Sequence, residues 1–412
     1  MTDDISTPDW PTPTREAAEQ HLAAVLPRLG VRYAHRRNVD HGQGEHHHVS
    51  QLSPFLRRRL LLETDVMAAA LARHGAEGAE KFLQEILWRS YFKGWLERRP
   101  QIWHSYRDGL RADLDRLDDD PDLRDAVERV QAGETDLDCM NAWARELTET
   151  GYLHNHARMW FASIWVFTLR LPWRLGADFF YRHLLDGDPA SNTLSWRWVC
   201  GLHTRGKFYE AQAWNIAKFT DHRFTPDASD LAEVTAGLED HEPDSLPDLQ
   251  PLRSPNAPDP DTPTALLVTE EDCRPDDFPL DRFDIRATAT LAASALRAPG
   301  PVGEKVVEFE AAALADTAQR IARKADNLQA GDPDMLAHWA TEAGASQIVT
   351  PYVPTGPLRD WLDAAEPALE KAGITLCEWR RDWDALVWPH ATTGYFKVRK
   401  KLPDLLHQAG LA

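Results

Sequence analysis

The stretch Leu147–Trp198 reads LTETGYLHNHARMWFASIWVFTLRLPWRLGADFFYRHLLDGDPASNTLSWRW, and the rest of the chain is best understood from it. It is mostly apolar, yet polar residues interrupt it at 154–156 and 158. Buried polar groups need partners, so a simple core helix would not carry them. On a helix, Asn155, Arg158 and Met159 lie at i, i+3 and i+4 and share one face. An amide, a guanidinium and a thioether side by side predict the wall of a pocket.

The second half of this stretch predicts the start of another helix. In the sequence DGDPASN, Asp188 has the position of an N-cap and Pro189 that of the first helical residue. Asn192 then lies one turn into the helix. Asp186 is a natural counter-ion for Arg158, so the two segments are expected to meet.

The pieces TGYLHNHARMW, DGDPASN and WRW, in this order and at this spacing, resemble the flavin-binding core of the DNA photolyase and cryptochrome family. The resemblance implies an all-helical FAD-binding domain, which we assign to residues 1–224. It also implies FAD as the cofactor, whereas a second, antenna chromophore stays unknown. By the same resemblance, FAD would be bound by Arg158, Asp186, Asp188 and Asn192.

Two earlier segments extend the resemblance. VSQLSPFLRRRLL is similar to the loop and helix start that hold the flavin diphosphate in this family, with Ser50, Leu52 and Ser53 at matching positions. Val49 replaces the usual threonine. A helix N-terminus suits this task because its free N–H groups attract phosphate. Tyr33, which precedes an RRN element, resembles the family's entry to the flavin site.

The segment KFLQEILWRSYFKGWLERRP predicts an amphipathic helix. Glu85, Trp88, Arg89 and Phe92 fall at 0, 3, 4 and 7 and form one stripe. An acid on an aromatic stripe is unusual unless the stripe faces a polar ligand. By resemblance, Glu85 and Trp88 would face the substrate base pair and Arg89 would face FAD.

The resemblance also assigns the remaining site residues. Asn155, Met159 and Trp198 would line the substrate cavity together with Glu85 and Trp88. Trp196 and Trp173 match the first two members of the tryptophan chain that reduces the flavin again, while the third member stays open between Trp103 and Trp95.

The C-terminal part of the chain has a different pattern. Residues 225–262 are rich in Pro and Asp and predict a flexible, extended linker. In residues 263–412, short apolar runs alternate with helical stretches, which predicts a Rossmann-like α/β domain. It resembles the antenna domain of photolyases, which comes first in that family. We therefore expect a circular permutation, and the acidic sequence TEEDCRPDD after the first strand puts antenna-pigment binding and DNA contact by this domain in doubt.

Composition limits the remaining alternatives. The four cysteines are far apart and the chain has no predicted signal or membrane segment, so we expect a cytoplasmic protein without membrane contact. Most of the net charge of −19 falls in the second half, and the acidic residues 108–138 predict an exposed connection. The run HGQGEHHH could hold a metal through residues 45–48, but adjacent histidines point in different directions, so no metal is expected.

The expected enzyme is a deoxyribodipyrimidine photolyase that repairs cyclobutane pyrimidine dimers in damaged DNA, using light and reduced FAD. The alternative is a cryptochrome-like blue-light photoreceptor, favoured by the acidic charge and by His156 where many dimer-repair enzymes hold an arginine. A third possibility is a flavoprotein with neither activity. Protein partners are not indicated by the sequence.

Overall fold

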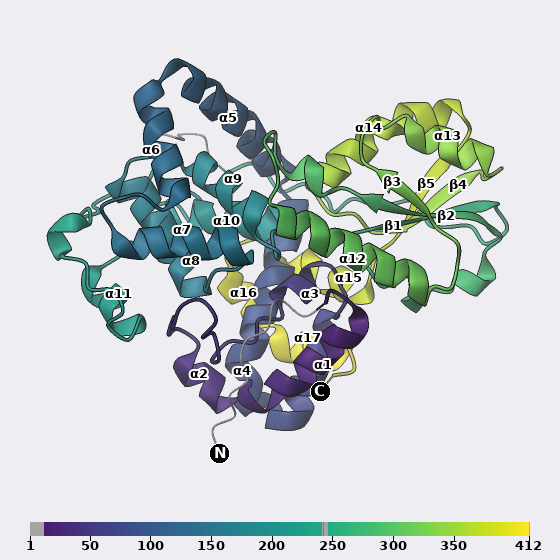
Figure 1. Ribbon diagram of the computed structural model, residues 1–412. Coiled ribbons are helices and arrows are strands. Elements are labelled where there is room, and N and C mark those ends of the chain that lie inside the picture. Colours follow the sequence, from purple (N-terminus) through teal and green to yellow (C-terminus); the bar gives the residue numbers. More distant parts are fainter. Residues whose placement is uncertain (1–11, 241, 243–245, 412) are drawn as a thin grey trace.

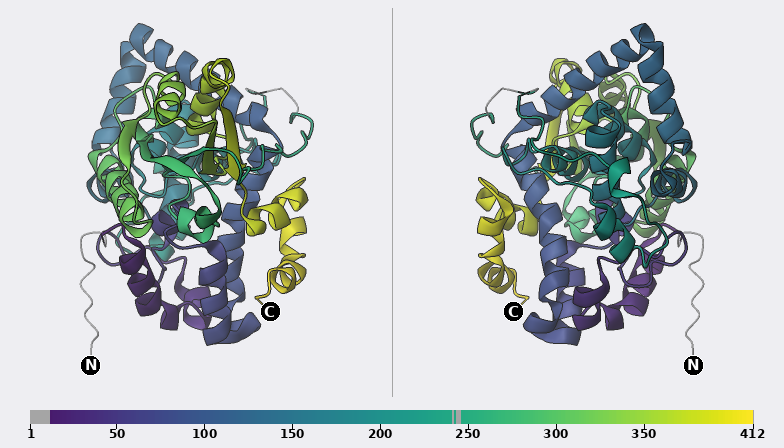
Figure 2. Two further views of the ribbon diagram at one scale, coloured as in Figure 1. Left: turned by 90° about the vertical axis from the view of Figure 1, so that its right-hand side faces the viewer. Right: turned by 90° about the vertical axis from the view of Figure 1, so that its left-hand side faces the viewer.

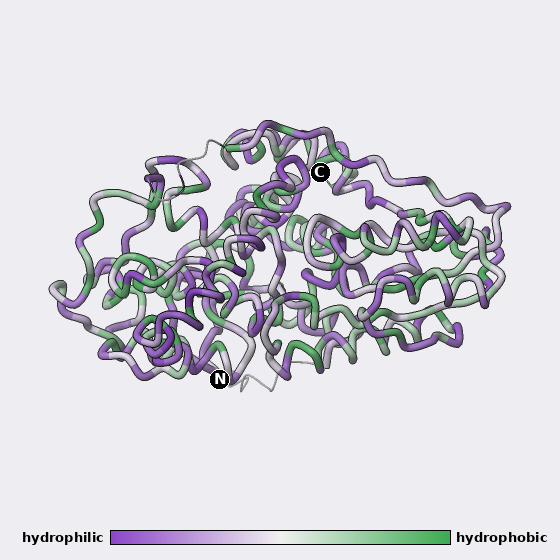
Figure 3. The backbone as a smooth tube through the Cα atoms, turned by 90° about the horizontal axis from the view of Figure 1, so that it is seen from above, coloured by the Kyte–Doolittle hydropathy of each residue, from purple (hydrophilic) through white to green (hydrophobic). Residues whose placement is uncertain are grey.

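The structure is a computed structural model that describes residues 12–240, 242 and 246–411. It contains a helical domain followed by an α/β domain, as the sequence predicted (Figure 1). Seen from above, the two domains lie side by side, and hydrophobic and hydrophilic residues alternate along their helices (Figure 3). In the described residues, no helix is both long enough and apolar enough to cross a membrane.

The first domain is helical throughout. Its helices are α1 (Arg15–Val25), α2 (Val31–Arg36), α3 (Ser53–Arg57), α4 (Glu63–Glu97), α5 (Pro100–Asp119), α6 (Pro121–Ala132), α7 (Asp138–Thr150), α8 (Asn155–Ser163), α9 (Trp173–His183), α10 (Pro189–Val199) and α11 (Ala213–Phe219). Local chemistry sets several boundaries. Asp188 caps α10 by accepting a hydrogen bond from the Ser191 N–H, with Pro189 in the first turn, and α7 ends at Gly151 in the left-handed conformation.

The acidic region 108–138 is not the exposed connection that its charge predicted. Its residues form most of α5, all of α6 and the start of α7. Leu110, Val127 and Val130 are buried, whereas most of the acidic side chains remain exposed. The prediction was wrong because it rested on the charges alone and overlooked apolar residues that recur at helical spacing between them.

The second domain is a five-stranded parallel sheet in the order β3-β2-β1-β4-β5. Its elements are β1 (Thr264–Thr269), β2 (Ile285–Ala292), α12 (Glu304–Arg320), β3 (Asp326–Gln329), α13 (Met335–Glu342), β4 (Gln347–Pro351), α14 (Pro357–Lys371) and β5 (Thr375–Trp379). Alternate residues of the buried strand β1 belong to two cores: Leu266 and Val268 pack on the α12 side, and Ala265 and Leu267 pack on the side of α13 and α14. Helices therefore cover both faces of the sheet (Figure 1).

The chain returns to the helical domain at its end. The final helices are α15 (Asp382–Val387), α16 (Tyr395–Arg399) and α17 (Leu402–Gln408). They lie along α4, on its opposite side from the N-terminal helices (Figure 2). Trp383 donates to the Ser90 hydroxyl (2.8 Å), and Trp388 packs on Gly94, where a Cβ atom would lie only 2.7 Å from its ring.

The described residues between 225 and 262 are mostly irregular, apart from a short 3-10 helix at Ala228–Asp230, and hydrogen bonds join them to both domains. Glu242 accepts from Trp173 Nε1 (2.8 Å) and pairs with Arg197 (2.9 Å) in the helical domain. Arg253 pairs with Glu378 on β5. The assignment of 225–262 as a flexible linker and of 263–412 as one unit stays a prediction.

The acidic loop after β1 is buried against three consecutive arginines at the end of α3. Arg57 pairs with Glu271 (2.6 Å), Arg58 with Glu270 (3.1 Å) and Arg59 with Asp272 (3.3 Å). In parallel sheets, the crevice at the carboxyl ends of the strands is the usual ligand site. Here arginine side chains of the helical domain reach the loop at the carboxyl end of β1. The acidic loop therefore joins the two domains.

Candidate functional site

A cavity of about 550 Å³ lies between α2, α4, α8 and α10. The predicted site residues on its wall are Tyr33, Ser50, Ser53, Glu85, Trp88, Arg89, Asn155, Arg158, Met159, Asp186, Asp188, Asn192, Trp196 and Trp198. The volume and the mixture of apolar walls with a few polar groups are typical of a cofactor site. Sequence segments more than 160 residues apart thus meet in one place.

The floor of the cavity comes from α8 and the turn before α10. Asn155, Arg158 and Met159 all line it, and Arg158 binds Asp186 through two hydrogen bonds of 3.1 and 2.9 Å. Burial alone would raise the pKa of Asp186, but the Arg158 charge and hydrogen bonds hold it below its usual value. Asp186 therefore stays ionised and fixes the guanidinium at the cavity wall.

Asp188 and Asn192 lie on the next turn of this floor. Burial would raise the pKa of Asp188, but Lys93 (3.6 Å), Arg89 (3.5 Å) and Arg57 together lower it well below its usual range. Asn192 donates through Nδ2 to the Ala177 carbonyl (2.8 Å), which holds its side chain in place. The site thus offers a fixed carboxylate and a fixed neutral amide.

One wall comes from the predicted stripe on α4. Glu85, Trp88, Arg89 and Phe92 all line the cavity. Glu85 pairs with Arg37 at 2.5 Å, and its pKa is raised by burial against the opposing effects of Arg37 and nearby Lys81. Sequence reasoning did not include Arg37 among the site residues, although it belongs to the RRN element that drew attention to Tyr33.

The loop before α3 contributes Ser50 and Ser53 to the wall. The Leu52 side chain is fully buried in the core and does not line the cavity, so its predicted contact with FAD could come only from its backbone and stays a prediction. Its backbone N–H donates to the Ser50 hydroxyl at 3.4 Å. Leu52 therefore anchors the loop from beneath.

Both predicted electron-transfer tryptophans are buried, but they differ in their distance from the cavity. Trp196 lines the cavity and packs edge-on against Phe180, with ring centroids 5.2 Å apart. Trp173 does not line the cavity; its ring lies 5.7 Å from that of Tyr106, which lies 5.4 Å from that of Trp103. Of the two candidates for a third member, Trp103 is thus linked to Trp173 through one intervening ring, whereas Trp95 packs against His203.

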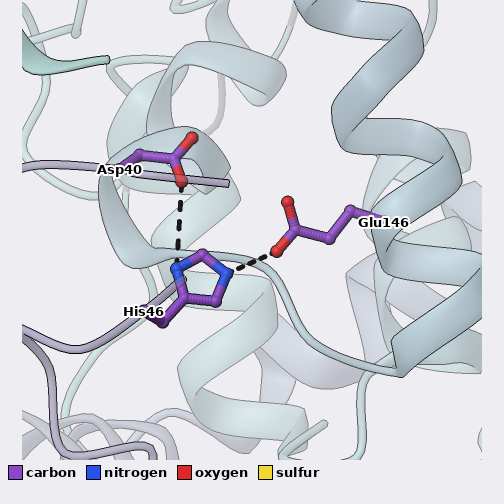
Figure 4. Close-up of side chains that lie close together, drawn as sticks. All are labelled: Asp40, His46 and Glu146. Carbon is purple, nitrogen blue, oxygen red and sulfur yellow. Dashed lines mark hydrogen bonds and ion pairs between the residues drawn. The ribbon is translucent and has the colours of Figure 1, made fainter. Parts of the chain in front are cut away.

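The histidine run does not converge on one point. His46 is buried, with Glu146 at its Nε2 atom (2.5 Å) and Asp40 at its Nδ1 atom (3.9 Å), as Figure 4 shows. Only the Glu146 contact has the length of a hydrogen bond, whereas Asp40 lies at the other ring nitrogen and too far away for one. The expectation that no metal binds here stays a prediction. The His46 ring also stacks on His154, the N-cap of α8 (5.8 Å), and so supports the cavity floor from behind.

Comparison with known proteins gives this cavity a context. Residues 82–228 match the family model described as the FAD binding domain of DNA photolyase. A deoxyribodipyrimidine photo-lyase of Thermus thermophilus is 35% identical over 192 residues, which cover 47% of this chain and 44% of that protein. Another, of Streptomyces griseus, is 35% identical over 159 residues, or 38% of this chain and 32% of that protein.

A cryptochrome DASH of Idiomarina loihiensis is also similar, with 30% identity over 197 residues, or 46% of this chain and 41% of that protein. The chain thus matches less than half the length of each of these relatives. The matched region contains the α4, α8 and α10 walls of the cavity.

Proposed function

We propose that this chain, whose residues 82–228 are an FAD-binding domain of the photolyase and cryptochrome family, is a light-driven enzyme that repairs cyclobutane pyrimidine dimers in DNA. The observation that carries the proposal is the cavity itself. It gathers a glutamate, an asparagine, a methionine and two tryptophans beside the polar floor: Glu85, Asn155, Met159, Trp88 and Trp198.

The polar floor and the loop before α3 fit FAD. We assign the flavin ring to Arg158, Asp186 and Asn192, and the diphosphate to Ser50, Ser53 and the start of α3. Arg89, which bonds Glu63 and the Arg57 carbonyl, adds positive charge at the cavity edge (both 3.3 Å). When bound and reduced, FAD supplies an electron to the dimer after it absorbs light. Asn192 offers a neutral amide beside the ring, which suits an anionic reduced flavin better than a carboxylate would.

Glu85 is the residue that we assign to the dimer. A carboxylic acid can donate a hydrogen bond to a carbonyl only when it is protonated, and burial moves the pKa of Glu85 in that direction. In the free protein Arg37 holds the carboxylate, so substrate binding has to rearrange this pair. Glu85 would then stabilise the negative charge that develops on the dimer.

His156 supports the photoreceptor alternative. Its pKa is lowered, chiefly by burial, so the ring is neutral at pH 7, and it stacks on Trp160 (4.1 Å). A neutral ring at this position provides less attraction for a phosphate than an arginine would. A cryptochrome-like photoreceptor, with Trp196 and Trp173 as electron donors to the flavin, is therefore the second candidate.

Light-dependent repair tests the proposal. Purified protein with photoreduced FAD is mixed with an oligonucleotide that contains one thymine dimer, and thymine absorbance is followed under blue light. We expect recovery with the wild type and a drop of about 10- to 100-fold in rate for Glu85→Gln, because the variant loses the acid proton and its pairing with Arg37.

Glu77→Gln is the matched control, since Glu77 is exposed on the same helix. It should repair at the wild-type rate. A wild type that binds and photoreduces FAD but leaves the dimer intact would contradict the repair proposal and favour the photoreceptor.

A further inference from the structure

The end of the chain packs on the cavity wall. Tyr395, the first residue of α16, stacks on Trp88 with ring centroids 3.5 Å apart and planes 11° from parallel. Its hydroxyl donates to the Gln84 carbonyl (2.8 Å). The Thr393 carbonyl accepts from the Tyr91 hydroxyl (2.8 Å), so several bonds fix this segment on α4. Residues 395–401, called the tail segment below, therefore begin directly behind the cavity tryptophan.

The tail segment is basic, in a chain with a net charge of −19. It contains Lys397, Arg399, Lys400 and Lys401, of which the three lysines are exposed. None of these four cations forms an ion pair with another residue in the described ranges 12–240, 242 and 246–411. In such an acidic protein, four unpaired cations in five residues are not explained by internal charge pairing.

An aromatic side chain lies among these cations. Phe396 is 64% exposed, although large apolar side chains are usually covered, and the Arg399 guanidinium lies 5.3 Å from its ring centroid. Cations interleaved with an exposed aromatic ring are typical of surfaces that hold phosphates and stack on unpaired bases.

Charged residues of the tail segment and of the cavity act on the same side chain, Tyr395. Burial raises the pKa of Tyr395, Glu85 raises it further, and Arg399 and Arg37 lower it, so the tail and the cavity acid lie within electrostatic reach of one phenol. Arg37, which lines the cavity, pairs with Glu85, and Lys81 is close enough to Glu85 to lower its pKa. The positive groups thus extend from the cavity to the tail.

We propose that the tail segment is part of the DNA-binding surface, in which Lys397, Lys400 and Lys401 contact backbone phosphates beside the cavity and Phe396 stacks on a base. This proposal rests on the proposed function, because it places DNA at the same cavity. A dimer flipped into the cavity leaves the phosphates of its neighbouring nucleotides outside it, and the tail segment starts at Tyr395, which stacks on the cavity residue Trp88. The local charge also explains how so acidic a chain could bind a polyanion.

Salt-dependent binding in the dark tests this surface. Affinity of the FAD-loaded protein for a labelled oligonucleotide with one thymine dimer is measured by fluorescence anisotropy between about 50 and 200 mM salt. For the triple variant K397Q/K400Q/K401Q we expect at least about tenfold weaker binding at the low-salt end. We also expect the slope of log affinity against log salt to fall by about 2 to 3, because each neutralised phosphate contributes about 0.9.

The matched control is R323Q/K324Q/K371Q. Arg323 and Lys324 follow α12 and Lys371 ends α14, so these exposed cations lie next to the amino ends of β3 and β5. The helical domain instead contacts the loop at the carboxyl end of β1. The control should keep the wild-type affinity and slope, and both variants should keep their flavin content and melting temperature. Phe396→Ala should weaken binding about fivefold or more with an unchanged slope, because it removes stacking and no charge.

An unchanged slope in the tail variant would overturn the proposal, and so would a wild type that binds anionic lipid vesicles through these lysines but no DNA. The two hypotheses fail separately. Repair by the wild type with a normal slope in the tail variant would reject only the tail surface. Tail-dependent binding without repair would reject only the repair activity.

Discussion

Asp186 shows how a single side chain organises the cavity floor. It lies in the turn before α10, whereas its partner Arg158 lies on α8, so their pair joins two segments that carry four of the nine predicted flavin contacts. The pKa of Asp186 remains low despite its burial because Arg158 supplies the compensating charge. Removing one member of such a pair leaves the other charge without its partner.

Asp186→Asn is expected to lose flavin and stability together. Breaking this pair should lower the free energy of unfolding by about 2–4 kcal/mol, measured by urea titration, and reduce the flavin absorbance per protein several-fold. Asp115→Asn, a change at an exposed aspartate of α5, should alter neither quantity measurably. Full flavin retention by Asp186→Asn would contradict the role assigned to the pair.

At the scale of elements, α4 is the central support of the molecule. One stripe faces the cavity, and another part of its surface receives the C-terminal helices. Gly94 allows this close approach, since a Cβ atom there would lie 2.8 Å from the Trp388 backbone and 2.7 Å from its ring. Backbone atoms cannot move aside as a flexible side chain can, so the contact requires glycine.

Gly94→Ala should therefore displace the C-terminal helices. We expect a loss of about 1–3 kcal/mol in the free energy of unfolding, although alanine favours a helix more than glycine does. Gly78→Ala on the same helix is the control: its nearest neighbour is the His74 Cβ at 3.2 Å, so stability should change by less than about 1 kcal/mol. Protease cleavage within the last 25 residues of Gly94→Ala, but not of the control, would locate the damage.

At the scale of the whole molecule, the two domains are joined by a buried cluster of opposite charges. Arg58 and Arg297 flank Glu270, whose neighbour Glu271 binds Arg57. Burial alone would raise the pKa of Glu270, yet these arginines lower it from about 4.5 to about 2. Folding therefore favours the ionised carboxylate, so this stabilisation is complete above about pH 4.5 and is lost as the pH falls toward 2.

Glu270→Gln should weaken this joint and reduce its dependence on pH. At pH 6 the variant should be less stable by about 3 kcal/mol, because it leaves buried arginines short of one charge. Between about pH 4.5 and 2 its free energy of unfolding should fall less steeply than that of the wild type. Glu308→Gln, at an exposed site on α12, should follow the wild-type curve, and an identical curve for Glu270→Gln would show that the cluster does not hold the domains together.

The sequence by itself determined the helical and α/β domains, the capped start of α10 and the residues that share the cavity stripe. These depend on local periodicity and capping, which neighbouring residues specify. Only the tertiary structure decided that the acidic loop meets three arginines about 213 residues away, that Arg37 holds Glu85, and that Tyr395 supports Trp88. Contacts between residues so distant in sequence depend on how complete surfaces pack, and no local pattern carries that information.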